Sequence, residues 1–155
     1  MARDISVPRW VTFLLLLVAT AAILATTISM AGASYSKVDP VPFEDIRHLI
    51  NRLEHRATST QVLAILVMPI IANVVLFVPW AFLMFITLHS AERPTVQIYV
   101  LTILLGLSFT LGIEAWQYFL PSRVADVNDI IWNTAGTVVG AMLGHLRLRV
   151  RFEFD

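Results

Sequence analysis

Four apolar stretches, each about as long as a membrane-spanning helix, dominate this chain of 155 residues. A helix needs about 20 mostly apolar residues in a row to cross the hydrocarbon core of a bilayer. The stretches lie at about residues 10–32, 62–88, 96–120 and 127–146. Because they leave no room for a second globular domain, we predict a single all-α, polytopic membrane domain over residues 1–155 with four transmembrane helices.

The composition supports a membrane protein and excludes some kinds of chemistry. Hydrophobic residues make up 57% of the chain and charged residues 14%, against about 45–50% and about 25% in an average soluble domain. The formal net charge is zero, so nothing in the composition indicates binding to nucleic acid. The chain has no cysteine, which excludes disulfides, thiol catalysis and cysteine-based metal sites.

The first apolar stretch has two interpretations. Arg3 and Arg9 precede it, and Ala31-Gly32-Ala33 resembles a signal-peptidase site. However, the apolar run is longer than the 7–15 residues of a typical signal peptide. We therefore expect a retained helix, with Trp10 in the aromatic belt at the membrane interface.

Residues 33–61 form the main polar segment, and Pro40 and Pro42 interrupt its start. After them, apolar residues recur at helical spacing, which predicts a short amphipathic helix over about residues 43–56. Such a helix would lie on the membrane interface or cover a site between the spans. The apolar positions are Phe43, Ile46, Leu49, Ile50 and Leu53.

Polar and ionisable residues gather where the third and fourth apolar stretches meet. Such residues are costly near a bilayer, so they are rare there and usually functional. Glu114 is the candidate general base, although we do not assign catalysis on this basis. The candidate binding residues are Asn73 in the second stretch, Gln117 in the third, Arg123 in the connection, and Asp126, Asp129 and Asn133 in the fourth.

The spacing of these residues predicts one pocket. Asp126, Asp129 and Asn133 follow an i, i+3, i+7 pattern and share a helical face. Glu114 and Gln117 end the preceding helix, so all these residues should line one pocket that opens outward. We also expect Asn73 to approach Glu114, Gln117 or Asn133, because a polar group in hydrocarbon needs a partner.

Each of these residues also has a structural interpretation. Asp126 or Asn128 could cap the fourth helix, and Asn73 could join two helices by a hydrogen bond. The whole cluster could serve only to hold the helices together. The spacing of Asp126 and Asp129 is also compatible with a divalent cation such as Mg²⁺, so a cation cofactor is a further alternative.

Two patterns near the C-terminus bear on packing and orientation. Gly136, Gly140 and Gly144 form a repeated small-xxx-small pattern, which favours tight helix packing and makes oligomerisation through this stripe possible. Arginines cluster directly after the last apolar stretch, which places that end inside by the positive-inside rule. We therefore expect a multi-pass protein of the cell membrane with both termini cytoplasmic. The clustered residues are Arg147, Arg149 and Arg151.

Two blocks of residues resemble the VanZ-like family, which is named after an accessory protein of teicoplanin resistance. The first block is Asn73-Val-Val-Leu-Phe77-Val-Pro79. The second consists of Glu114, Gln117, Arg123, Asp126, Asp129, Asn133, Gly136 and Gly140. The resemblance covers about residues 69–145, and it departs from the family pattern at Ala81, where the family commonly has glycine. It implies an integral membrane protein of the bacterial cell envelope but supplies no reaction.

These observations favour a protein that binds or modifies an amphiphile of the outer leaflet and contributes to envelope properties or glycopeptide resistance. Membrane lipids, a lipid-linked wall precursor or a lipoglycopeptide would suit the site, and Arg123 could hold a phosphate or carboxylate. Two alternatives stay open. One is a membrane-embedded, metal-assisted hydrolase or transferase, and the other is a small oligomeric transporter.

Overall fold

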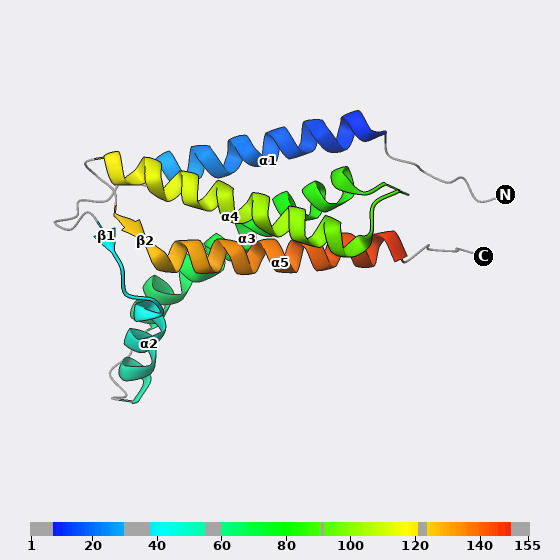
Figure 1. The fold of residues 1–155 in the computed structure, drawn as a ribbon. Coiled ribbons are helices and arrows are strands. Elements are labelled where there is room, and N and C mark those ends of the chain that lie inside the picture. The colour runs from blue at the N-terminus through cyan, green and yellow to red at the C-terminus, as the bar shows by residue number, and fades with distance from the viewer. Residues whose placement is uncertain (1–7, 30–37, 55–59, 91, 121–123, 150–155) are drawn as a thin grey trace.

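The structure is a computed structural model, and it describes residues 8–29, 38–54, 60–90, 92–120 and 124–149. In this part of the chain, five α-helices and two very short strands occur (Figure 1). In chain order they are α1 (Arg9–Ser29), β1 (Val38–Asp39), α2 (Glu44–Glu54), α3 (Thr60–Leu88), α4 (Thr95–Phe119), β2 (Ala125–Asp126) and α5 (Val127–Arg149).

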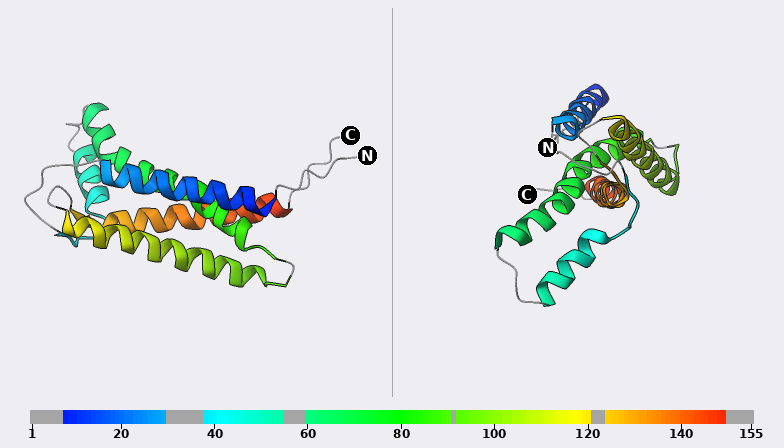
Figure 2. Two further views of the ribbon diagram at one scale, coloured as in Figure 1. Left: turned by 90° about the horizontal axis from the view of Figure 1, so that it is seen from above. Right: turned by 90° about the vertical axis from the view of Figure 1, so that its left-hand side faces the viewer.

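The four long helices form an up-and-down bundle (Figure 1). Successive long helices run in opposite directions, so the start of α1 and the end of α5 lie at the same end of the bundle. The end of α4 and the start of α5 lie at the opposite end. The short helix α2 projects sideways from that opposite end, as the two views in Figure 2 also show. Helix α2 lies within the segment, residues 43–56, where the sequence predicted a short amphipathic helix, and the position of that helix on the membrane interface stays a prediction.

Three helices in the described part of the chain are long and apolar enough to cross a membrane. The qualifying segments are Trp10–Thr27 in α1, Val67–Leu88 in α3 and Thr95–Phe119 in α4. Helix α5, where we expected the fourth span, has sufficient length at 23 residues. Its glycines and polar side chains, such as Asn133 and His145, make it too polar to qualify on composition. A fourth crossing is therefore not confirmed.

The centre of the bundle is the contact between α3 and α5, which only glycine permits. A Cβ atom on Gly140 would lie 2.8 Å from the Cβ atom of Ala81, and one on Gly144 would lie 3.0 Å from that of Phe85. A Cβ atom on Gly136 would collide with the carbonyl oxygen of Val74. The glycine stripe is thus covered by α3 of the same chain, and oligomerisation stays a prediction.

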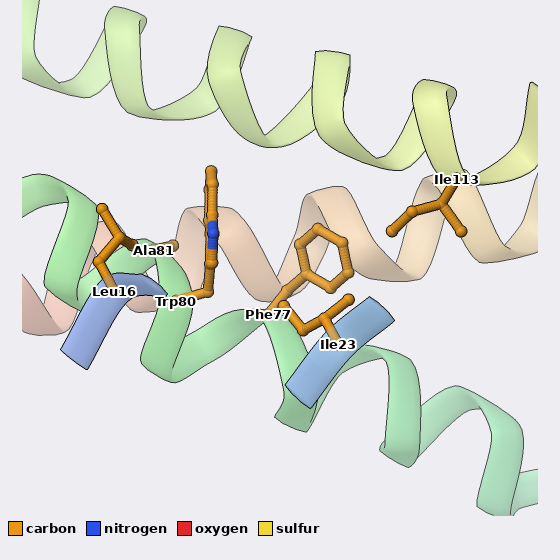
Figure 3. Packing of buried hydrophobic residues seen from close by; sticks show 6 residues of the cluster. All are labelled: Leu16, Ile23, Phe77, Trp80, Ala81 and Ile113. Atoms are coloured by element: carbon orange, nitrogen blue, oxygen red, sulfur yellow. The ribbon is translucent and has the colours of Figure 1, made fainter. Parts of the chain in front are cut away.

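Helix α1 rests on the outside of this centre and contacts α3 and α4. Leu16 and Ile23 point into an apolar cluster with Phe77, Trp80 and Ile113 (Figure 3). Polar and aromatic contacts add to this attachment.

The indole N–H of Trp80 donates a hydrogen bond to Thr20 Oγ1 at 3.0 Å. The indole ring also stacks on Phe109 of α4, with the ring centroids 5.4 Å apart. Most other large side chains of α1 are exposed, as expected for a surface that faces lipid. They are Trp10, Phe13, Leu14, Leu15, Leu17, Val18 and Leu24.

Candidate functional site

The candidate residues gather at the end of the bundle where α4 ends and α5 begins. Here β1, from the polar segment that follows α1, pairs with β2 just before α5. The pairing is parallel, with Val38 opposite Ala125 and Asp39 opposite Asp126. The polar segment is therefore attached directly to the start of α5, which sequence periodicity did not indicate.

Glu114 and Asp126 stabilise the start of α5 through backbone hydrogen bonds. Glu114 is only 5% exposed, and its Oε2 atom accepts a hydrogen bond from the backbone N–H of Asp126 at 2.8 Å. Asp126 Oδ1 in turn accepts from the backbone N–H of Asn128 at 2.7 Å. That contact caps the helix and favours a negative charge at its N-terminus. The capping interpretation of Asp126 therefore applies.

Asn73 connects α3 to α5. Its Nδ2 atom donates a hydrogen bond to Asp129 Oδ1 at 2.5 Å. The sequence had suggested Glu114, Gln117 or Asn133 as neighbours of Asn73. The hydrogen-bond partner is instead an aspartate, because Asp129 lies one turn closer than Asn133 to the start of α5.

Asn133 connects α5 to α4 deeper in the bundle. It is buried, and its Nδ2 atom donates a hydrogen bond to Thr110 Oγ1 at 2.8 Å. Its Oδ1 atom has no hydrogen-bond partner among the described residues, and the same holds for Trp132 Nε1 and Thr134 Oγ1. The contact with Thr110 corresponds to the structural role that buried amides often have between membrane helices.

Asn128 connects the start of α5 to the polar segment, whereas the sequence had suggested only that it could cap α5. It is 1% exposed. Its Oδ1 atom accepts from the backbone N–H of Phe43 at 2.6 Å, and its Nδ2 atom donates to the carbonyl oxygen of Val41 at 3.3 Å. Phe43 has a φ of 60°, a conformation that is uncommon for a bulky residue. No sequence signal could reveal this contact, because its partners are 85 residues apart.

Two cavities lie beside the C-terminal part of α1. One, of about 680 Å³, lies between α1 and α3 and extends to α4 and α5. The other, of about 420 Å³, lies between α1 and α4. Thr27 and Gln117 line both cavities. Sequence reasoning missed both cavities, because they depend on how α1 rests against its neighbours.

The larger cavity is lined mainly by apolar side chains. These come from α3, and Asn73, Gln117 and Asp129 add polar groups. Thr26 and Thr27 add hydroxyl groups from α1. The apolar lining residues are Met68, Pro69, Ala72, Val75 and Leu76.

Three of the seven candidate residues therefore share one cavity, and the others have different positions. Glu114, Asp126 and Asn133 are not part of the lining of the larger cavity. They form the contacts within the bundle given above. Arg123 lies outside the described residues. The cluster expected from spacing is thus present at one end of the bundle, but only part of it faces a cavity.

The described residues do not form a metal centre. In that part of the chain, no group of three or more His, Cys, Asp or Glu side chains is placed to hold a metal ion. Asp126 caps α5, and Asp129 accepts from Asn73. The divalent cation that the spacing of these two aspartates suggested stays a prediction.

Comparison with known proteins places the chain in a family. The sequence model of the VanZ/LLP1 family matches residues 10–148, which is most of the chain. No curated protein and no solved structure matches it significantly. The matched range contains α3 and α4, all but one residue each of α1 and α5, and every candidate site residue. Three of these helices are apolar enough to cross a membrane, and the chain belongs to the VanZ/LLP1 family of membrane proteins.

Proposed function

We propose that this protein binds an amphiphile of the outer leaflet in the cavity between α1 and α3. The observation that carries the proposal is the volume of about 680 Å³ and the lining of this cavity. Apolar walls with a few polar groups are typical of sites that orient a ligand. The hydrocarbon part would lie along α3, and the polar head would contact Asn73, Gln117 and Asp129.

The proposal includes a transmembrane position for α5. Two polar side chains of α5 have partners inside the bundle, since Asp129 contacts Asn73 and Asn133 contacts Thr110. Its glycines face α3. The large side chains that α5 exposes are apolar and would suit contact with lipid; they are Val139, Met142, Leu143 and Leu146. Four crossings would then place both termini on the same side of the membrane.

The orientation follows from charge. Arg147 and Arg149 lie in the last turn of α5, Arg151 follows it in the sequence, and positive residues favour the cytoplasmic side. Asn73, Gln117 and Asp129, the polar lining residues of the cavity, would then lie toward the outer side of the membrane, together with α2. Helix α2 exposes Ile50 and Leu53, which suits a helix that lies on the membrane interface.

The polar side chains that line the cavity favour binding over catalysis. The amides of Asn73 and Gln117 can donate and accept hydrogen bonds, and Asp129 can accept them. Glu114, the candidate base, holds a backbone N–H and does not line the cavity. A bound hydroxyl, amide or amine head group would find partners here. Retention of such an amphiphile is how the protein would affect the envelope and the response to glycopeptides.

Lipid mass spectrometry of the purified, full-length protein tests this proposal. One lipid species should co-purify above its share in the membrane. The variants Gln117→Ala and Asn73→Ala should reduce this enrichment by about tenfold or more, the effect of losing about 1.4 kcal/mol of binding energy. Gln97→Ala, an exposed position on α4, is the matched control and should keep the enrichment.

Two results would contradict the proposal. If the wild-type protein carries lipids only in bulk proportions, the cavity holds no specific amphiphile. If enrichment persists in both variants while their thermal unfolding is unchanged, the ligand binds elsewhere. If a variant loses both the lipid enrichment and its folded structure, Gln117→Glu replaces it in the test, because this variant keeps the shape of the side chain.

A further inference from the structure

We infer that the ligand has two hydrocarbon chains, one on each side of α1. This inference rests on the proposed function and specifies the class of amphiphile. The two cavities occupy opposite sides of the same helix segment. Leu24 and Thr27 of α1 line the cavity toward α4, whereas Thr26 and Thr27 line the cavity toward α3.

The attachment of α1 explains why two cavities exist instead of one. Ile23 is almost fully buried and packs in the core cluster with Phe77 and Ile113. This contact holds the middle of α1 between α3 and α4. Beyond it, toward the polar end of the bundle, the cavities open on either side of the helix.

Gln117 stands where the two cavities meet. It is 4% exposed and lines both cavities. Its side-chain amide can both donate and accept hydrogen bonds, so a polar group of the ligand at this point would find a partner. A head group bound at Gln117 would direct one chain into each cavity.

Both cavities have the size and lining that a hydrocarbon chain needs. Volumes of about 420 and 680 Å³ lie within the usual range of ligand pockets. Each cavity has an exposed residue at its edge, Trp116 for the smaller and Met68 for the larger. A chain can therefore reach either cavity sideways from the lipid phase.

The preference for two chains would come from packing. Lipid tails are as apolar as leucine, so moving a chain from the bilayer into a cavity gains little from the hydrophobic effect. The gain arises from close contact with the cavity walls and grows with the number of contacts. A single-chain amphiphile would leave one cavity to bulk lipid and would gain only part of this energy.

The test measures the ratio between a two-chain and a one-chain probe. Phosphatidylglycerol and its lyso form, with equal acyl chains, compete for the delipidated full-length protein, and native mass spectrometry records the occupancy of each. Gly112→Phe obstructs the smaller cavity, where a Cβ atom on Gly112 meets nothing within 4 Å. Ala72→Phe obstructs the larger cavity. Ala115→Phe, at an exposed position of α4, is the control.

We expect the wild type and the Ala115→Phe control to prefer the two-chain probe by about tenfold or more. Each cavity variant should reduce this ratio to about one, with unchanged thermal unfolding. A variant that unfolds is replaced by Gly112→Leu or Ala72→Leu, which fill less volume.

The other outcomes separate the two proposals. Equal binding of both probes to the wild type overturns the two-chain inference and leaves a one-chain ligand, such as a lipoglycopeptide with a single acyl chain. Loss of the preference in Ala72→Phe but not in Gly112→Phe also overturns it, because only one cavity would then matter. If neither probe binds above bulk level, and no lipid co-purifies with the wild type, the proposed function itself fails.

Discussion

In helices α1 and α5, apolar composition and burial within the bundle do not go together. Helix α1 is one of the three apolar segments, yet it lies on the outside and exposes most of its large side chains. Helix α5 is too polar to qualify as a span by composition, yet it contacts both α3 and α4 at the centre of the bundle (Figure 2). The more apolar helix is the less buried one.

The reason for this reversal lies in the solvent. In a bilayer, apolar side chains gain little by leaving lipid for protein, so α1 has no strong reason to pack closely. Polar groups lack water there and need partners within the protein. In the proposed arrangement with four crossings, Asp129 and Asn133 of α5 would need such partners, and Asn73 and Thr110 supply them. The difference also explains why both cavities occur beside the loosely packed helix α1. The larger cavity also reaches Asp129 of α5.

The largest expected effect is at the glycine contact of α5. Gly140→Leu would place a side chain against the backbone of Val78 and against Ala81, and overpacking of this kind costs about 3 kcal/mol. Thermal unfolding of the purified protein should show a large loss of stability. Gly112→Leu on α4 is the matched control, since its Cβ atom would enter open space. Equal losses in the two variants would mean that α5 is not tightly packed against α3.

A smaller effect is expected at the start of α5. Asn128→Ala would leave the backbone N–H of Phe43 and the carbonyl oxygen of Val41 without their partner. Unpaired buried groups cost about 2 kcal/mol. Hydrogen exchange at Phe43 should become faster, while Gln97→Ala leaves it unchanged. Unaltered exchange in Asn128→Ala would show that the β1–β2 pairing alone holds this segment.

The smallest effect is expected at the attachment of α1. Trp80→Phe keeps an aromatic ring but loses the N–H that donates to Thr20, which should cost about 1 kcal/mol. Val18→Ala, at a position that is 65% exposed, should change stability by less than about 0.5 kcal/mol. Unfolding measured in the same detergent compares the two. A larger loss in Val18→Ala would show that the outer face of α1 is covered by protein.

The helices themselves were predictable from sequence. The expected spans at 62–88, 96–120 and 127–146 correspond closely to α3, α4 and α5. The first expected span, 10–32, agrees with α1 as far as Ser29, and residues 30–32 lie outside the described part. The positions of the helices were predictable because helical periodicity and apolar length are local properties of the chain, whereas the fourth crossing stays a prediction.

The partners of the polar residues were only partly predictable. Spacing correctly placed Glu114, Asp126 and Asp129 at one end of the bundle, and the cap at Asp126 was one of the alternatives considered. The bond between Asn73 and Asp129 joins residues 56 positions apart. Which residue Asn73 bonds to depends on the rotation of α3 against α5, and the glycine contacts set this rotation.

The sequence alone thus determined the helical class, the family blocks and the types of polar group available for a site. The tertiary structure alone decided which of those groups face a cavity and which bond to the backbone. The division has a physical cause. Helix formation depends on neighbours a few residues away, whereas the space beside α1 depends on side chains from several helices that meet only in the folded bundle.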